Sequence, residues 1–151
     1  MLVKALLESK PRRLITASPS TSIDEAMDLL ISNSIGCLPV LEDDKLIGII
    51  SDQDIFKKVH QTKGEYHSLK VQDVMTVDLI VGLPDDEISY IVGLMGKNWI
   101  RHIPIIEDEK LVGLVSQRDI VKKQTENIKV ENRYLKMYTE GMSRRDKSGD
   151  Y

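Results

Sequence analysis

The heptapeptide Gly48-Ile49-Ile50-Ser51-Asp52-Gln53-Asp54 recurs later in the chain as Gly113-Leu114-Val115-Ser116-Gln117-Arg118-Asp119, at an offset of 113 − 48 = 65 residues. The same offset holds without a gap from Leu14 to Lys58, where 18 of about 45 positions are identical to their counterparts in 79–123. A fixed period of this kind indicates one supersecondary unit that occurs twice.

Composition limits the class of protein. The 151 residues are 41% hydrophobic and 30% charged, with a net charge of −3, which is typical of a globular protein without a general affinity for nucleic acid or anionic membranes. No apolar run approaches the roughly 20 residues of a membrane span, and the N-terminus lacks a signal-peptide core. Cys37 is the only cysteine, which excludes an internal disulfide. We therefore predict a cytoplasmic protein.

Each unit is predicted to run strand, helix, strand, strand, helix. The first unit begins with a short strand at 14–16 and a helix that Ser22 and Glu25 open as a capping box. This helix should reach about Asn33 and be broken by Gly36. The remaining elements are strands at 37–41 and 46–50 and a helix that Ser51 opens.

The second unit repeats this order. It should contain a strand at 79–81, a helix at 85–97, strands at 102–106 and 111–115, and a helix from Ser116. A short amphipathic helix at 3–9, ended by Pro11, precedes the first unit, and 61–68 is a polar linker. A further helix at 124–142 carries Ile128, Leu135 and Met142 spaced by sevens, and the charged tail should be disordered. The predicted divisions are 7–62, 69–124, 125–142 and 143–151.

One unit has too few elements to bury both of its faces, so the two copies must pack together, most simply about a pseudo-twofold axis. The predicted fold is therefore mixed α/β, with two β-α-β-β-α motifs and two related clefts at their junction. Flat surfaces would remain that could bring two chains together.

At these residues the chain resembles a tandem pair of cystathionine-β-synthase (CBS) domains, over roughly 7–124. The resemblance rests on the Val-x-Asp-Val-Met-Thr phrase at 71–76, on a proline before each first helix, and on two repeated phrases. These are Asn-x-Ile-x-x-h-Pro-h at 33–40 and 98–105, where h is apolar, and Leu-h-Gly-h-h-Ser-x-x-Asp-Ile at 46–55 and 111–120.

The resemblance implies a disc-shaped homodimer of CBS pairs that acts as a regulatory module. It implies a ligand that contains adenosine: AMP, ADP or ATP, and with less support S-adenosylmethionine or NAD(H). On this reading the nucleotide is a regulatory ligand, no cofactor is required, and an unidentified protein partner receives the signal.

The two Ser-x-x-Asp phrases, Ser51 to Asp54 and Ser116 to Asp119, admit two readings. The spacing alone is explained by a capping box at a helix start. A carboxylate at this place could also accept hydrogen bonds from two adjacent ribose hydroxyls, as an acidic residue does in dinucleotide-binding folds. The readings are compatible, and the resemblance favours a ribose role for at least one Asp.

The resemblance implies that each cleft takes the Ser-x-x-Asp of one unit and the lead-in and helix end of the other. The preferred cleft would then use Asp119, Ser116, Arg118, Leu114, Arg101, His102, Lys10, Arg12, Ile35 and Gly36. The second cleft would use Asp54, Ser51, Gln53, Ile49, Gly36, Cys37, Met75, Val77, Ile100 and Arg101.

Charge distinguishes the two clefts. The Asp119 cleft gathers several cations suited to phosphate, whereas the counterparts in the Asp54 cleft, matched at the 65-residue offset, are uncharged. We expect the phosphate in the Asp119 cleft, and the Asp54 cleft either empty or holding a less charged adenosyl group. Arg101 and Arg118 could instead be solvated surface charges. Arg12 could block the adenine or reach a phosphate, and Trp99 is expected to pack in the core or a dimer rather than to stack on a base.

Catalysis and metal binding are not predicted. His60, His67 and His102 do not form a metal-ligand spacing with Cys37, and neither a Walker loop nor a Gly-x-Gly-x-x-Gly motif is present. The chain should therefore not be an enzyme. The alternative to a sensor is a structural dimerisation protein that binds no ligand.

Overall fold

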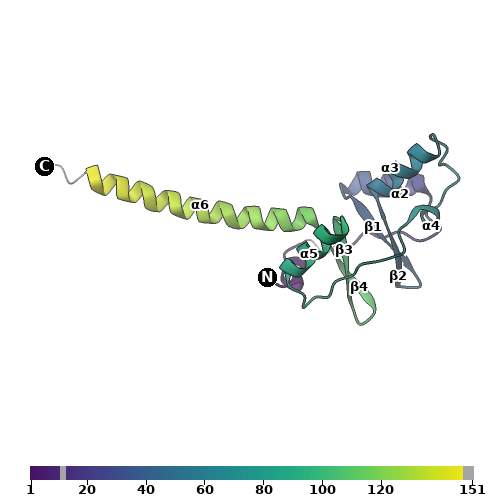
Figure 1. Cartoon of the computed structure of the whole chain (residues 1–151), viewed down its shortest axis with the longest axis horizontal. Coiled ribbons are helices and arrows are strands. Elements are labelled where there is room, and N and C mark those ends of the chain that lie inside the picture. Colours follow the sequence, from purple (N-terminus) through teal and green to yellow (C-terminus); the bar gives the residue numbers. More distant parts are fainter. Residues whose placement is uncertain (11–12, 148–151) are drawn as a thin grey trace. The chain divides into compact units, whose positions relative to one another are not determined.

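The computed structural model describes residues 1–10 and 13–147, and side chains as far as residue 140. It divides into two compact units, Met1–Ser116 and Gln117–Tyr151, which are described separately. The first unit contains both repeats up to the end of the last strand, and the second contains the final helix (Figure 1). The class is mixed α/β, as predicted.

The first repeat consists of α2 (Ile23–Asn33), β1 (Cys37–Glu42), β2 (Lys45–Ser51) and α3 (Asp52–Gln61). The predicted capping box at the start of α2 is confirmed: Ser22 Oγ accepts from the Glu25 N–H, and the Glu25 carboxylate accepts from the Ser22 N–H. The expected break at Gly36 is wrong in detail. Ser34 adopts the left-handed conformation that ends the helix, with φ of 51°.

The second repeat contains α5 (Ile88–Asn98), β3 (His102–Glu107) and β4 (Lys110–Ser116). Helix α5 begins three residues later than the expected 85, because the residues before it form a turn. The Asp86 carboxylate accepts from the Leu83 N–H, while the Asp86 N–H donates to the Leu83 carbonyl. Trp99 ends α5 in the left-handed region, as Ser34 ends α2.

Two antiparallel hairpins form the sheet structure, β1 with β2 and β3 with β4. Their registers are equivalent, with Pro39 opposite Ile49 and Pro104 opposite Leu114. Strands β2 and β4 lie close to one another, which brings the two hairpins together within the first unit.

The predicted strands at 14–16 and 79–81 are wrong. Each is reduced to one parallel bridge, Ala17 with Val40 and Gly82 with Ile105. Ala17 donates to the Pro39 carbonyl and accepts from the Leu41 N–H, but a longer ladder would next need an N–H from residue 39. Proline has none, and Pro104 imposes the same limit beside Gly82.

The segments that lead into the repeats are exchanged. Helix α1 (Val3–Glu8) precedes the first repeat but bonds to the second, through Val3 N–H to the Asp86 carbonyl and Lys4 N–H to the Pro84 carbonyl. Helix α4 (Val71–Val74) precedes the second repeat but bonds to the first, through Val71 N–H to the Thr21 carbonyl. The exchange ties the two repeats into one unit.

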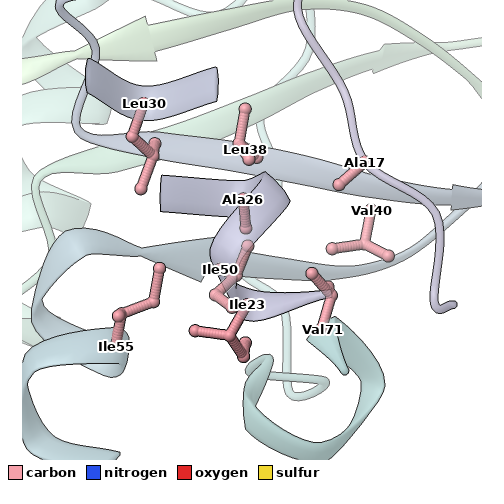
Figure 2. Close-up of a cluster of buried hydrophobic side chains, with 9 residues drawn as sticks. All are labelled: Ala17, Ile23, Ala26, Leu30, Leu38, Val40, Ile50, Ile55 and Val71. Atoms are coloured by element: carbon pink, nitrogen blue, oxygen red, sulfur yellow. The ribbon is translucent and has the colours of Figure 1, made fainter. Parts of the chain in front are cut away.

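A buried apolar cluster holds the first repeat together (Figure 2). Its members are Ala17, Ile23, Ala26, Leu30, Leu38, Val40, Ile50, Ile55 and Val71. Val71 from α4 completes the cluster, so the lead-in of the second repeat forms part of the core of the first. Burial of each valine, leucine or isoleucine side chain in this cluster contributes about 1.5–3 kcal/mol.

Helix α6 (Gln117–Lys147) is one continuous helix (Figure 1). It joins the predicted last helix of the second repeat to the predicted helix at 124–142, and it extends five residues past 142 into the segment expected to be a disordered tail. Residues 148–151 lie outside the described part of the chain.

Candidate functional site

Asp54 is held by the start of α3. Its Oδ2 accepts from the Ser51 N–H at 2.9 Å, and its own N–H donates to Ser51 Oγ at 3.1 Å. The predicted capping box is therefore present. Among the described residues, Oδ1 of this half-buried carboxylate has no hydrogen-bond partner, so the box fixes the group while leaving acceptor capacity.

Arg101 crosses from one repeat to the other. It precedes β3, and its Nη2 donates to Oδ1 of Asp52 at 2.6 Å, in the first turn of α3. The Asp52 N–H in turn donates to the Gly36 carbonyl at 2.9 Å, and Oδ1 also accepts from the Gln53 N–H. The guanidinium that was expected near phosphate is thus paired with a carboxylate of the first repeat.

Gly36 leaves space for a side chain of the other repeat. A Cβ built there would lie 3.1 Å from Cε1 and 3.2 Å from Nε2 of His102, and 3.6 Å from Asp52 Oδ2. Gly36, His102, Asp52 and Arg101 therefore meet at the junction of the repeats, as three of these residues were predicted to do.

Cys37 lies buried beside this group, opposite Ser51 in the hairpin. Burial raises the pKa of its thiol to about 12, with a further upward contribution from Asp52. Arg101 and Lys10 lower it and Asp54 raises it, so both signs of charge lie within range of the thiol. The Cys37 thiol is therefore protonated near neutral pH, which is not the state of a nucleophilic cysteine.

The backbone edges of β2 and β4 are covered differently. Ile49 exchanges both of its backbone hydrogen bonds with Thr76, at 3.0 and 2.8 Å. At the equivalent place on β4, the Leu114 carbonyl accepts from Lys10 Nζ at 2.9 Å. Ile49 can therefore offer a ligand only its side chain, and Lys10 is confirmed as a neighbour of Leu114.

The 65-residue offset, which makes Met75 the counterpart of Lys10, does not hold in the segments that lead into the repeats. A Cβ at Gly48 would lie 2.6 Å from Met75 Sδ, and one at Gly113 would lie 2.7 Å from Cδ2 of Leu7. Leu7 is thus the counterpart of Met75, at an offset of 75 − 7 = 68. The segment 9–13 is three residues longer than its counterpart Val77 and Asp78, and the extra length carries basic residues.

The remaining predicted site residues differ in how far they are exposed. Val77 is 65% exposed, Ile35 and Ile100 are half-buried, and Gln53 is exposed. Trp99 is 92% exposed, so it does not pack in the core, and the other expectation, that it packs in a dimer, stays a prediction. Arg12 lies outside the described residues. Arg118 and Asp119 occupy the first turn of α6, in the second unit, and their role in a cleft stays a prediction.

Sequence reasoning missed Asp52 and Thr76. Asp52 was treated as a spacer within Ser-x-x-Asp, although its counterpart is the uncharged Gln117 and that difference was visible. Thr76 acts through its backbone, which leaves no signal in residue type. Among the described residues, no group of three or more His, Cys, Asp or Glu side chains could hold a metal ion, and no helix is long and apolar enough to cross a membrane.

Comparison with known proteins identifies the family of the two repeats. The family model of the CBS domain matches twice, at residues 9–61 and 71–126. The CBS domain-containing protein YhcV of Bacillus subtilis is 29% identical over 83% of this chain and 89% of its own length.

Two further relatives are an enzyme and a protein solved with bound ligands. An inosine-5'-monophosphate dehydrogenase of Methanocaldococcus jannaschii is 36% identical over 81% of this chain, which spans only 24% of that protein. The solved CBS domain pair of protein MJ0100, in complex with 5'-methylthioadenosine and S-adenosyl-L-methionine, is 33% identical. It matches 84% of this chain and 98% of its own, with a TM-score of 0.74. Because the family model covers most of the sequence in two consecutive matches, this chain belongs to the CBS domain family and carries a tandem pair of such domains.

Proposed function

We propose that this chain is a regulatory module that binds an adenosine-containing ligand between its two CBS domains and signals the occupancy to a partner protein. AMP, ADP or ATP are the preferred candidates, followed by S-adenosylmethionine and NAD(H). The module would act in the cytoplasm as a homodimer, without catalysing a reaction.

The observation that carries the proposal is the state of Asp54. Its capping box fixes the carboxylate beside the junction of the repeats, and Oδ1 retains its acceptor capacity among the described residues. Two adjacent ribose hydroxyls need two acceptor positions, which a fixed carboxylate offers without the cost of ordering a mobile side chain. Asp119 is assigned the same role because it repeats the Ser-x-x-Asp phrase.

The two clefts are proposed to differ in ligand. The cleft of Asp119 is proposed to take the nucleotide phosphate, since the sequence supplies it with Lys10, Arg12 and Arg118. The cleft of Asp54 is proposed to take a less charged adenosyl group. The complex of the MJ0100 pair with two adenosyl compounds supports this class of ligand for a relative of similar fold.

Signalling requires a difference in affinity between two states of the protein. Two contacts join the repeats: the ion pair of Arg101 with Asp52, and the His102 ring against Gly36. A ligand could drive the rearrangement of these contacts. The alternative is a structural dimerisation protein whose clefts bind nothing.

Isothermal titration tests the proposal. The protein is titrated with AMP, ATP, S-adenosylmethionine and NADH, beside Asp119→Ala, Asp54→Ala and the exposed control Asp28→Ala. Saturable binding that Asp119→Ala abolishes and Asp28→Ala preserves supports the proposal and its preferred cleft. Binding lost only in Asp54→Ala overturns the choice of cleft. The absence of binding heat with all four ligands overturns the proposal in favour of the structural dimerisation protein.

A further inference from the structure

The Arg101–Asp52 ion pair joins a cation that the site would offer to phosphate with a carboxylate from the other repeat. Nη2 of Arg101 lies 2.6 Å from Oδ1 of Asp52, and the side chains are 46% and 53% exposed. From this pair we infer that Asp52 sets the charge preference of the cleft of Asp54: it counters Arg101 there and so disfavours ligands that carry several phosphates. The inference rests on the proposed function and names a residue that controls which adenosyl ligand is bound.

Asp52 is held in place independently of Arg101. Its backbone N–H donates to the Gly36 carbonyl at 2.9 Å, and its Oδ1 accepts from the Gln53 N–H at 2.7 Å. The carboxylate is therefore fixed at the helix start whether or not Arg101 remains paired. A ligand that drew Arg101 away would leave Asp52 in the same position, facing the ligand as an uncompensated negative charge.

The repulsion acts inside the site rather than at a distance. Oδ2 of Asp52 lies 3.6 Å from the position of a Cβ on Gly36, the same point that the His102 ring approaches to 3.1 Å. Asp52 also contributes to the raised pKa of the buried Cys37. A phosphate at this junction would meet Asp52 within a few ångströms, well inside the Debye length of about 10 Å at 0.1 M salt.

The pair is also asymmetric between the repeats. The counterparts of Asp52 and Arg101 at the 65-residue offset are Gln117 and Gly36, so the second repeat cannot form the equivalent pair. The capping box requires only Ser51 and Asp54, and it does not explain an acid at 52. The pair accordingly distinguishes one half of an otherwise repeated site, and its effect is on ligand charge rather than on the ribose.

Asp52→Asn provides the test, because the amide keeps the shape and the acceptor for the Gln53 N–H while it removes the charge. Affinities for ATP, adenosine and S-adenosylmethionine, whose sulfonium is a cation, are measured by titration in the native protein and the variant. The binding event that Asp54→Ala removes is the one compared, so that only the cleft of Asp54 is read. Asp28→Asn, an exposed acid on α2, removes the same charge elsewhere.

The expected result is a change of opposite sign for the two charged ligands. ATP should bind about fivefold more tightly to Asp52→Asn, S-adenosylmethionine about fivefold more weakly, and adenosine equally within about twofold. Asp28→Asn should leave all three unchanged. A structural role alone would move all three ligands together.

The outcomes separate the inference from the function it rests on. Equal affinities in both proteins, or a parallel change for all ligands, overturn the role of Asp52 and leave the adenosyl-binding proposal intact. ATP binding that appears only in Asp52→Asn supports the inference in its strongest form. No binding to either protein overturns both.

Discussion

Nη2 of Arg101 and Oδ1 of Asp52 lie 2.6 Å apart and join the segment before β3 to the first turn of α3. The two residues are 49 positions apart in sequence and belong to different repeats. The Asp52 N–H also donates to the Gly36 carbonyl of the same repeat. Arg101 of the second CBS domain is therefore joined, through Asp52, to the start of α3 in the first domain. It is a contact between the domains rather than within one.

A double-mutant cycle on Arg101→Gln and Asp52→Asn should give a small coupling energy for folding. About half of each side chain is exposed, so solvent screens the charges and the coupling should be about 0.2–1 kcal/mol. Urea unfolding of the four proteins measures it. The coupling should weaken in about 1 M salt, where the Debye length is near 3 Å. A value above about 3 kcal/mol, or one insensitive to salt, would mean that the pair is effectively buried.

Gly48→Ala should destabilise the fold by about 1–3 kcal/mol, because the new methyl group overpacks the junction. Its Cβ would lie 2.6 Å from Met75 Sδ and 3.2 Å from the Thr76 carbonyl, a backbone atom already bonded to Ile49. Chemical denaturation compares it with Gly93→Ala on α5, where nothing lies within 4 Å and alanine should be neutral or stabilising.

Met75→Ala provides a second check on Gly48, because a shorter side chain makes room for the methyl group. The double variant should be more stable than the sum of the two single losses predicts. Strict additivity would show that Thr76, and not Met75, sets the limit at this position.

How far sequence predicts this fold depends on whether a feature is local or lies between the repeats. The capping boxes at Ser22 and Ser51 and the paired hairpin strands follow from short patterns, and the structure confirms them. The prediction of a strand at 14–16 was wrong because the ladder would need a backbone N–H from Pro39, which has none. Pro39 belongs to another strand. That limit was readable only once the pairing partner was known.

The site shows the same division. The meeting of Gly36 with Arg101 and His102 followed from the family resemblance, and the structure brings them together. Leu7 and Met75 occupy equivalent places at an offset of 68 residues. Sequence reasoning missed this offset because it applied the 65-residue repeat to the lead-in of the first repeat, which is three residues longer than that of the second. A repeat offset holds only where both copies fold alike, and an insertion in one copy shifts every position before it.

Cys37 should resist alkylation in the folded protein. Burial raises the pKa of its thiol from 9.0 to about 12, so almost no thiolate exists at pH 8. Iodoacetamide should modify the native protein far more slowly than the protein in urea, followed by mass spectrometry. Comparable rates in both would show that the junction opens on the time scale of the reaction.

The same thiol makes stability depend on alkaline pH. The pKa of the Cys37 thiol is raised in the folded state, so only the unfolded chain ionises between pH 9 and pH 12. The stabilisation of the folded state by the protonated thiol is therefore fully present below pH 9 and is lost as the pH rises towards 12. The native protein should lose stability relative to Cys37→Ala by at most about 1.4 kcal/mol per pH unit. Denaturation curves at pH 8, 9 and 10 for both proteins measure the difference, and parallel curves would contradict it.

Self-association is predicted to use the exposed apolar side chains of α2 and α3. Ile31 and Phe56 are 77% and 75% exposed on two helices that lie against each other, and neither contributes to the buried cluster of the first repeat. Large side chains exposed in this way are typical of an interface, and a charge there would be desolvated on association. Phe56→Glu and Ile31→Glu should therefore convert a dimer to a monomer without loss of folding stability.

Light scattering coupled to size exclusion measures the mass of each variant, with circular dichroism to confirm folding. Val77→Glu supplies the control, since Val77 is 65% exposed on the segment after α4 and should leave the dimer intact. A native protein that is monomeric at micromolar concentration would contradict the homodimer outright. A dimer that survives both helix variants would assign the interface to another face, and α6, with Ile128 and Leu135 exposed seven residues apart, would be the next to test by the same substitution.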